Sequence, residues 1–280
     1  MKLIAVLAAA SLALPALAWG PEGHRVVARI AARNLTLKAR ARVASLLQSD
    51  PDPAAVAEAM ANASVWADTL DKLVTNTGAW HFINIALTDR RSDMSKRCPR
   101  DACVSGKIPE LLVSLKTESV ADWSVGDQLK FIIHLVGDLH QPLHCADNAD
   151  EGANCIHTTS FHSHTVHQAW DSGMLEKIDS SDIALANELS QHIQPAWKRG
   201  NVDDWAWESH ELAVRDAYGP LGLPKEPPMT IASCLTAPAP VRNKTVQLSQ
   251  RYLKLNEPVI RQQLAKAGIR LASLLNALWQ

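Results

Sequence analysis

The sequence lacks three features that would each point to a common class of protein. It has no excess of positive charge, with 28 lysines and arginines against 29 aspartates and glutamates, which argues against a broad basic surface for nucleic acid. Few segments alternate between apolar and polar residues, so a sheet-based fold is not expected. Beyond the first eighteen residues, no apolar run is long enough to cross a bilayer. If the protein handles phosphate, local cations must neutralise it.

The N-terminus carries the one long apolar run. Lys2 precedes the run from Leu3 to Leu17, and Ala16-Leu17-Ala18 matches a small-residue cleavage signal. We therefore predict that residues 1–18 are a signal peptide, with an uncleaved anchor as the alternative. Cleavage would make Trp19 the first residue of a secreted or periplasmic protein.

Cysteine is scarce, and all five residues follow the predicted leader. Export favours disulfides, and no pair has the C-x-x-C spacing of a thiolate zinc site. Proximity along the chain predicts two bonds, Cys98–Cys103 and Cys145–Cys155. Cys234 is then left over, either free or paired between chains.

Helical periodicity dominates residues 19–280, which we predict to form one all-α domain. We expect helices over 26–47, 54–73, 108–115, 125–139, 165–178, 183–198, 203–214 and 258–279. The proline-rich stretch from Gly219 to Pro240 is expected to be an excursion between helices, because too little chain follows it to fold alone.

Two helical segments repeat the same pair of metal-binding residue types. His134 and Asp138 stand four residues apart, and so do His167 and Asp171. This spacing places both side chains on one helical face, where they can bind one metal. A single copy is typical of a surface ion pair, but two copies within forty residues favour a metal centre. Between them lies His144, which follows the helix-ending Pro142.

Other residues of the same chemistry complete the pattern: Trp19, His24, Asp68 in Trp66-Ala67-Asp68, and His81 in Trp80-His81-Phe82. A free N-terminal amine and its own carbonyl can close a chelate ring on a metal. Imidazole and carboxylate without thiolate favour zinc in a catalytic site.

These motifs together resemble the S1/P1 nuclease family, whose fold is shared with phospholipase C. The resemblance rests on the tryptophan of the predicted mature N-terminus, WAD at 66–68, WHF at 80–82, HLVGDLHQPLH at 134–144 and HQAWD at 167–171. It covers essentially the whole mature chain. It implies a mostly helical domain around three zinc ions.

The resemblance also implies which residues hold each ion. One zinc is expected on Asp68, His81, His134 and Asp138, and a second on His144, His167 and Asp171. The third is expected on Trp19, His24 and a shared Asp138. His140 is expected to support the ligands from behind.

The implied activity is hydrolysis of RNA and single-stranded DNA to 5′-phosphorylated products, with 3′-nucleotidase activity, by a monomer that needs no membrane. A zinc-bound water would attack phosphorus, with Asp68 orienting it. Phe82 is expected to stack a base, Asn154 to contact one, and Lys72 to take the place of a basic residue near the phosphate. Asn84 stands where some relatives carry Asp, which predicts an altered base preference.

Two other functions remain open at this point. A zinc phospholipase C also begins with a ligating tryptophan, and release of a phosphatidylcholine head group would identify it. A zinc-storage protein without catalysis would bind the metal but cleave no phosphodiester. The mixed His and Asp ligands, in place of a flexible histidine-rich tract, argue against storage.

Overall fold

The computed structural model describes residues 19–280 except 71, 121, 229–233 and 243, and it does not describe the side chains of residues 72 and 73. The predicted signal peptide therefore lies outside the described residues. Helices make up most of the described chain: α1 Pro21–Arg33, α2 Leu37–Leu47, α3 Pro53–Ala63, α4 Lys72–Thr75, α5 Val104–Thr117, α6 Val125–Leu139, α7 Val166–Gln168, α8 Met174–Ile178, α9 Asp182–Ser190, α10 Val202–Leu212 and α11 Gln250–Leu278. The all-α prediction is confirmed.

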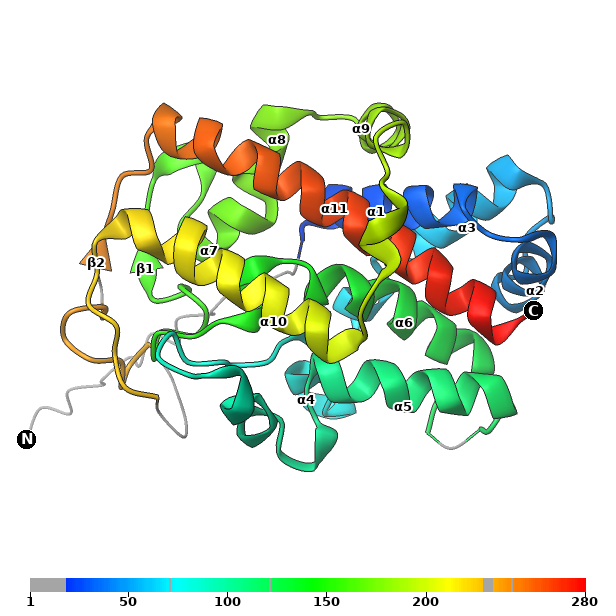
Figure 1. The fold of residues 1–280 in the computed structure, drawn as a ribbon, viewed down its shortest axis with the longest axis horizontal. Helices are drawn as coiled ribbons and strands as arrows, with labels where there is room; N and C mark the ends of the chain where they lie inside the picture. Colours follow the sequence, from blue (N-terminus) through cyan, green and yellow to red (C-terminus); the bar gives the residue numbers. More distant parts are fainter. Residues whose placement is uncertain (1–18, 71, 121, 229–233, 243) are drawn as a thin grey trace, which may run out of the picture.

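The apolar helix α6 lies at the centre of the core. Ser124 caps its N-terminus by accepting a hydrogen bond from the backbone N of Asp127 at 3.1 Å. Phe131, Leu135 and Val136 are fully buried, so the helix is covered on several sides. It packs against α5 and α11, and α1 packs against α11 (Figure 1).

Three predicted helices are broken in the structure. The stretch 26–47 forms α1 and α2, separated at Asn34–Thr36, because Thr36 caps α2 by accepting from the backbone N of Ala39. The stretch 54–73 ends as α3 at Ala63 and continues as a 3₁₀ turn, Trp66–Thr69. This second break places Asp68 on a turn beside α6. The stretch 183–198 ends as α9 at Ser190 and resumes as a 3₁₀ turn, Pro195–Lys198, because proline cannot continue a helix.

The stretch 165–178 is helical but irregular. Between α7 and α8 the backbone widens into a π-helical turn, Ala169–Gly173, that contains Asp171. Such single π turns occur frequently at functional sites. Trp170 within it is fully buried and donates from Nε1 to the hydroxyl of Tyr252 at 2.9 Å, which fixes the turn to α11.

The proline-rich excursion between α10 and α11 is held by a short sheet and a disulfide. Strand β1, Ile156–His157, pairs in parallel with β2, Lys244–Thr245, and Ile156 lies opposite Lys244 (Figure 1). The disulfide Cys155–Cys234 joins the same two parts of the chain.

One predicted disulfide is confirmed and the other is wrong. Cys98 is bonded to Cys103 as expected, but Cys145 is a buried free thiol and Cys155 is bonded to Cys234. The Cys145 side chain points into the core, where Sγ donates to the carbonyl of Leu139 at 3.4 Å. Closeness in sequence misled the prediction because the side chains of Cys145 and Cys155 face different parts of the fold.

No helix in the described part of the chain is both long and apolar enough to cross a membrane.

Candidate metal centre

Helix α6 and two 3₁₀ turns bring the first group of predicted ligands together. His134 Nε2 lies 3.2 Å from Asp138 Oδ2, one helical turn further on. The turn Gly78–His81 places His81 Nδ1 3.0 Å from both His134 Nε2 and Asp138 Oδ2. Asp68 Oδ1 is 3.7 Å from His134 Nε2. The ligand atoms of His81, His134 and Asp138 thus surround one small volume, and Asp68 adjoins them through His134.

His24 enters the same cluster from the first turns of α1. Its ring stacks on that of His134, with centroids 4.1 Å apart, and its Nε2 lies 3.3 Å from Asp138 Oδ1. Gly137 makes this approach possible, since a Cβ there would lie 2.6 Å from His24 Nδ1. Asp138 therefore lies between His24 on one side and His81 on the other.

The predicted N-terminal ligand lies beside the second group. Trp19 is fully buried, and the backbone N of Gly20 donates to the carbonyl of Asp171 at 2.7 Å. A Cβ at Gly23 would approach the Cβ of Trp19 to 2.8 Å. The start of the described chain is therefore packed tightly against a predicted ligand.

The second group consists of His144, His167 and Asp171. The Nε2 atoms of the two histidines are 3.2 Å apart, and Asp171 Oδ2 lies 3.3 Å from His167 Nε2. All three side chains are buried. Pro142 begins the turn that carries His144, and the π turn carries Asp171.

Backbone carbonyls set the tautomer of three of these histidines. The Nδ1 atoms of His134, His144 and His167 lie 2.7, 2.7 and 2.6 Å from the carbonyl oxygens of Ser64, His81 and Gly152. A carbonyl only accepts, so Nδ1 carries the proton and Nε2 of the neutral ring presents a lone pair. In the neutral rings, the Nε2 atoms of His144 and His167 face each other 3.2 Å apart with lone pairs, which repel unless a proton or a metal ion lies between them.

Buried polar atoms without hydrogen bonds indicate that the cluster around His134 and Asp138 also requires a cation. Within the described residues, Nδ1 of His24 is buried without a hydrogen-bond partner, and the 3.3 Å contact between His24 Nε2 and Asp138 Oδ1 does not have hydrogen-bond geometry. Buried polar groups of this kind are costly unless something binds them. A metal ion satisfies imidazole nitrogens and carboxylate oxygens together, so the residues fit one.

Electrostatics favour the metal-binding protonation state at several of these ligands but not at His134. Burial lowers the pKa of His134, but the charge of Asp138 outweighs burial and raises it to about 9, so a metal would have to displace a proton there. Burial, reinforced by the charge of His134, lowers the pKa of His24 to about 4, and burial with His144 lowers that of His167 to about 3. Burial disfavours the Asp138 carboxylate, but the neighbouring His134 outweighs it and holds the pKa of Asp138 well below its usual value. Neutral imidazoles and ionised carboxylates are the metal-binding forms.

Three trios of ligand atoms, each lying within 4.8 Å of one another, follow from this geometry: His24, Asp68 and His134; His81, His134 and Asp138; His144, His167 and Asp171. They contain nitrogen and oxygen but no sulfur, which favours a catalytic zinc over a structural one. A buried centre of this kind in a helical protein is typical of metal-dependent hydrolases.

Comparison with known proteins identifies the family within that class. The S1/P1 nuclease family model matches residues 19–280. Endonuclease 3 of Arabidopsis thaliana is 28% identical over all of this chain and 95% of its own length. Nuclease S1 of Aspergillus oryzae is 28% identical, covering 96% of both chains, and nuclease P1 of Penicillium citrinum is 26% identical, covering 92% of this chain and 97% of its own.

The chain belongs to the S1/P1 nuclease family. It is therefore a nuclease, a hydrolase that acts on the phosphodiester bonds of nucleic acid. The family is zinc-dependent, in agreement with the ligand trios. This membership removes the zinc-storage alternative and favours the nuclease over the phospholipase.

The structure places two predicted substrate residues on one edge of the centre. Phe82 is 38% exposed and Asn84 is partly exposed, whereas the intervening Ile83 and the following Ile85 are buried. This alternation turns Phe82 and Asn84 to the same side of an extended segment. The backbone N of Ile83 donates to the carbonyl of His144 at 2.8 Å, which ties the segment to the second trio.

The other two predicted substrate residues, Asn154 and Lys72, lie on different segments of the chain. Asn154 is partly exposed, and its Nδ2 donates to the carbonyl of Glu151 at 2.8 Å. Its loop adjoins the centre, because the backbone N of His167 donates to the carbonyl of Ala153 at 3.4 Å. Lys72 begins α4, but its side chain lies outside the described part of the chain.

The side chain of His140 bonds to groups other than the ligand residues. Its Nδ1 donates to the carbonyl of Val136 at 2.7 Å, and its Nε2 accepts from Arg270 at 2.9 Å. Arg270 also pairs with Glu208 at 2.9 Å. His140 therefore ties the end of α6 to α10 and α11, and it supports the turn that leads to His144.

Gln141, the next residue, was missed by the sequence interpretation. It is fully buried, and its Nε2 donates to Asp171 Oδ1 at 2.6 Å. Its position between a predicted supporting histidine and a ligand-bearing turn was the available signal.

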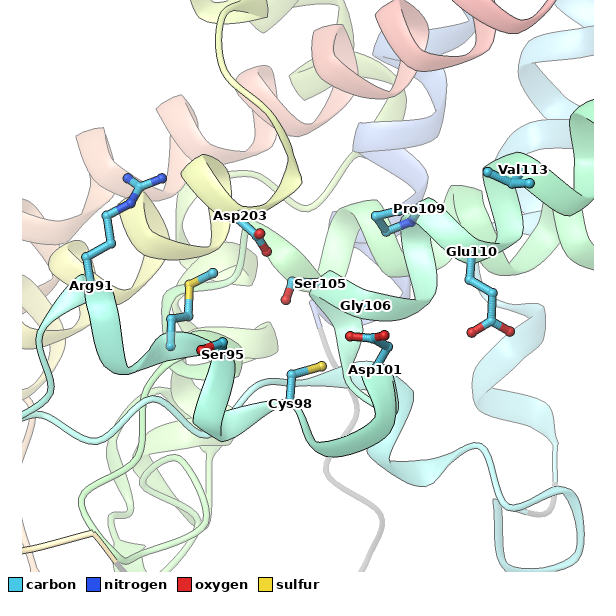
Figure 2. A pocket seen from close by; sticks show the side chains of 11 residues that line it. Arg91, Ser95, Cys98, Asp101, Ser105, Gly106, Pro109, Glu110, Val113 and Asp203 are labelled. Atoms are coloured by element: carbon cyan, nitrogen blue, oxygen red, sulfur yellow. The ribbon is translucent and has the colours of Figure 1, made fainter.

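A separate cavity lies between the turn Arg91–Arg97, α5 and the start of α10 (Figure 2). Its volume is about 660 Å³, and Arg91, Cys98, Glu110 and Asp203 are among the residues lining it. None of the predicted ligands lines this cavity, so it is not part of the metal centre.

Proposed function

We propose that this nuclease is an exported, zinc-dependent endonuclease that cleaves RNA and single-stranded DNA to 5′-phosphorylated products and also acts on 3′-nucleotides. The observation that carries the proposal is the pair of imidazole nitrogens, on His144 and His167, that face each other 3.2 Å apart with Asp171 beside them. Two disulfides fit an oxidising compartment.

Three zinc ions are proposed, on the ligand sets expected from the sequence. Asp68, His81, His134 and Asp138 hold the first, and His144, His167 and Asp171 hold the second. Cleavage after Ala18 frees the amine of Trp19, which joins its own carbonyl, His24 and Asp138 at the third. The buried position of Trp19 and the unsatisfied atoms of His24 and Asp138 support this third site.

Zinc bound there would act as a Lewis acid and lower the pKa of a bound water. Asp68, whose side chain is 13% exposed at the rim of the cluster, would accept a hydrogen bond from an attacking water and hold it toward phosphorus. Phe82 stacks a base, which suits single strands because every base has a π face. Asn84 and Asn154 contact base edges, and Lys72 binds phosphate.

The test is an activity assay on protein exported with its own leader, so that Trp19 is the first residue. Single-stranded RNA and DNA are supplied before chelation, after chelation and after zinc is returned. A matched protein carries one extra residue before Trp19. We expect zinc-restorable release of 5′-mononucleotides that is lost in the extended protein.

Other outcomes revise particular parts of the proposal. Activity that survives the extension would remove Trp19 as a required ligand but keep the nuclease. Failure of zinc to restore activity after chelation would contradict zinc dependence. Absence of cleavage of single strands, with cleavage of duplex, would contradict the proposed substrate preference.

A further inference from the structure

The orientation of the Gln141 side chain is fixed by its neighbours. The backbone N–H of Leu143 donates to Gln141 Oε1 at 2.6 Å. Since an N–H cannot accept, the atom facing it is the amide oxygen, and the amide nitrogen must face the other way. That nitrogen donates to Asp171 Oδ1 at 2.6 Å.

The backbone that carries Gln141 is also held in place. The backbone N of Gln141 donates to the carbonyl of Asp138 at 3.0 Å, and the carbonyl of His140 accepts from Gln263 Nε2 at 3.2 Å. Pro142 follows directly and prevents the helix from continuing. The donor to Asp171 is thus positioned by α6 and α11 together.

The hydrogen bond distinguishes the two oxygens of Asp171. Oδ1 receives the amide proton of Gln141 and lies 3.8 Å from His144 Nε2, whereas Oδ2 is the oxygen 3.3 Å from His167 Nε2. The backbone carbonyl of Asp171 accepts from Gly20 at 2.7 Å, so the residue is held at both ends within its π turn.

We infer that Gln141 is a positioning residue for the metal held by His144, His167 and Asp171: its amide holds Oδ1 and fixes the carboxylate so that Oδ2 lies beside His167. The inference rests on the proposed zinc site. Groups that orient a ligand in this way typically contribute a factor of about 10 to 100 in metal affinity.

The experiment titrates zinc-free protein with zinc in competition with a chromogenic chelator. Gln141→Leu removes the amide that donates to Asp171. Gln141→Glu puts a second carboxylate against the carboxylate of Asp171. We expect both variants to weaken one zinc site by about 10- to 100-fold and to leave the remaining zinc affinity unchanged. If the leucine variant does not fold, the glutamate variant carries the same comparison.

Gln128 provides the matched control. It is a buried glutamine in α6 whose Nε2 donates to the carbonyls of Ser119 and Trp123 at 2.7 and 3.0 Å, so Gln128→Leu also loses two hydrogen bonds. It should lower the thermal unfolding temperature without changing any zinc affinity.

Zinc binding by two kinds of variant distinguishes a failure of the positioning role from a failure of the proposed zinc site. Gln141 variants that bind zinc as the parent does would overturn the positioning role. His167→Ala protein that binds as many zinc ions as the parent would overturn the proposed site itself.

Discussion

The absence of a side chain at Gly137 allows His24 to lie against α6. Gly137 has no Cβ, and one placed there would be 2.6 Å from His24 Nδ1, well inside van der Waals contact. The stacking of His24 on His134 and its approach to Asp138 both depend on this space.

Gly137→Ala is therefore expected to displace His24, to reduce the bound zinc by one ion and to lower nuclease activity at least about tenfold. Alanine is more favourable than glycine within a helix by about 0.5–1 kcal/mol. The helix propensity of the new residue should therefore not lower the stability of the zinc-free protein. Zinc content and thermal unfolding measure the two effects. Gly126→Ala, in the first turn of the same helix, is the control. Full zinc content in Gly137→Ala would contradict the steric argument.

The identity of residue 84 is expected to set the base preference. Asn84 both donates and accepts hydrogen bonds, whereas an aspartate only accepts. Asn84→Asp should therefore narrow the preference among bases. Cleavage rates of the four homopolymers by the two proteins measure this, and identical profiles would show that residue 84 does not read the base.

At the level of elements, the sequence predicted regular helices better than their ends. The prediction for 125–139 is confirmed exactly by α6, because apolar residues, a serine cap and a following proline all agree. The break at Asn34–Thr36 was missed because apolar spacing continues across it. The π turn at Ala169–Gly173 has no recognised sequence signal.

Disulfide pairing was the least predictable feature, since it depends on how distant segments meet. The Cys155–Cys234 bond spans 79 residues, and such a bond typically contributes about 2–4 kcal/mol. We expect Cys155→Ala to lower the free energy of unfolding by that amount and Cys145→Ala by less. Chemical denaturation measures both. One alkylated cysteine per unfolded, unreduced chain is also expected, and modification of a residue other than Cys145 would contradict the pairing.

The turn after α6 should make the protein sensitive to acid. Burial, and then the charge of Arg270, lowers the pKa of His140 to about 3. The unfolded chain binds a proton near pH 6.5 and the folded chain does not, so stability falls as the pH drops below about 6.5.

His140→Asn removes the titrating imidazole. Between about pH 6 and 4, the free energy of unfolding of the zinc-free variant should depend on pH less steeply than that of the parent, by up to about 1.4 kcal/mol per pH unit. Equal slopes in denaturant titrations at several pH values would contradict the assignment.

On the scale of the whole molecule, the candidate centre gathers residues from position 19 to position 171. Repeated His and Asp spacing within helices could be interpreted from the sequence. Asp68 and His81 lie on turns and Trp19 precedes α1, so their place in the ligand sets depended on family resemblance. Gly137 and Gln141 were not foreseen, since their roles depend on contacts between elements.

The central claim is that this cluster is the zinc centre of the nuclease. The most direct test is a crystal structure of the exported protein grown with zinc, with anomalous diffraction recorded on both sides of the zinc absorption edge. We predict anomalous peaks within the cluster, one of them about 2.0–2.1 Å from Nε2 of His144 and of His167. A zinc-loaded, active protein with no peak between these two histidines would contradict the account.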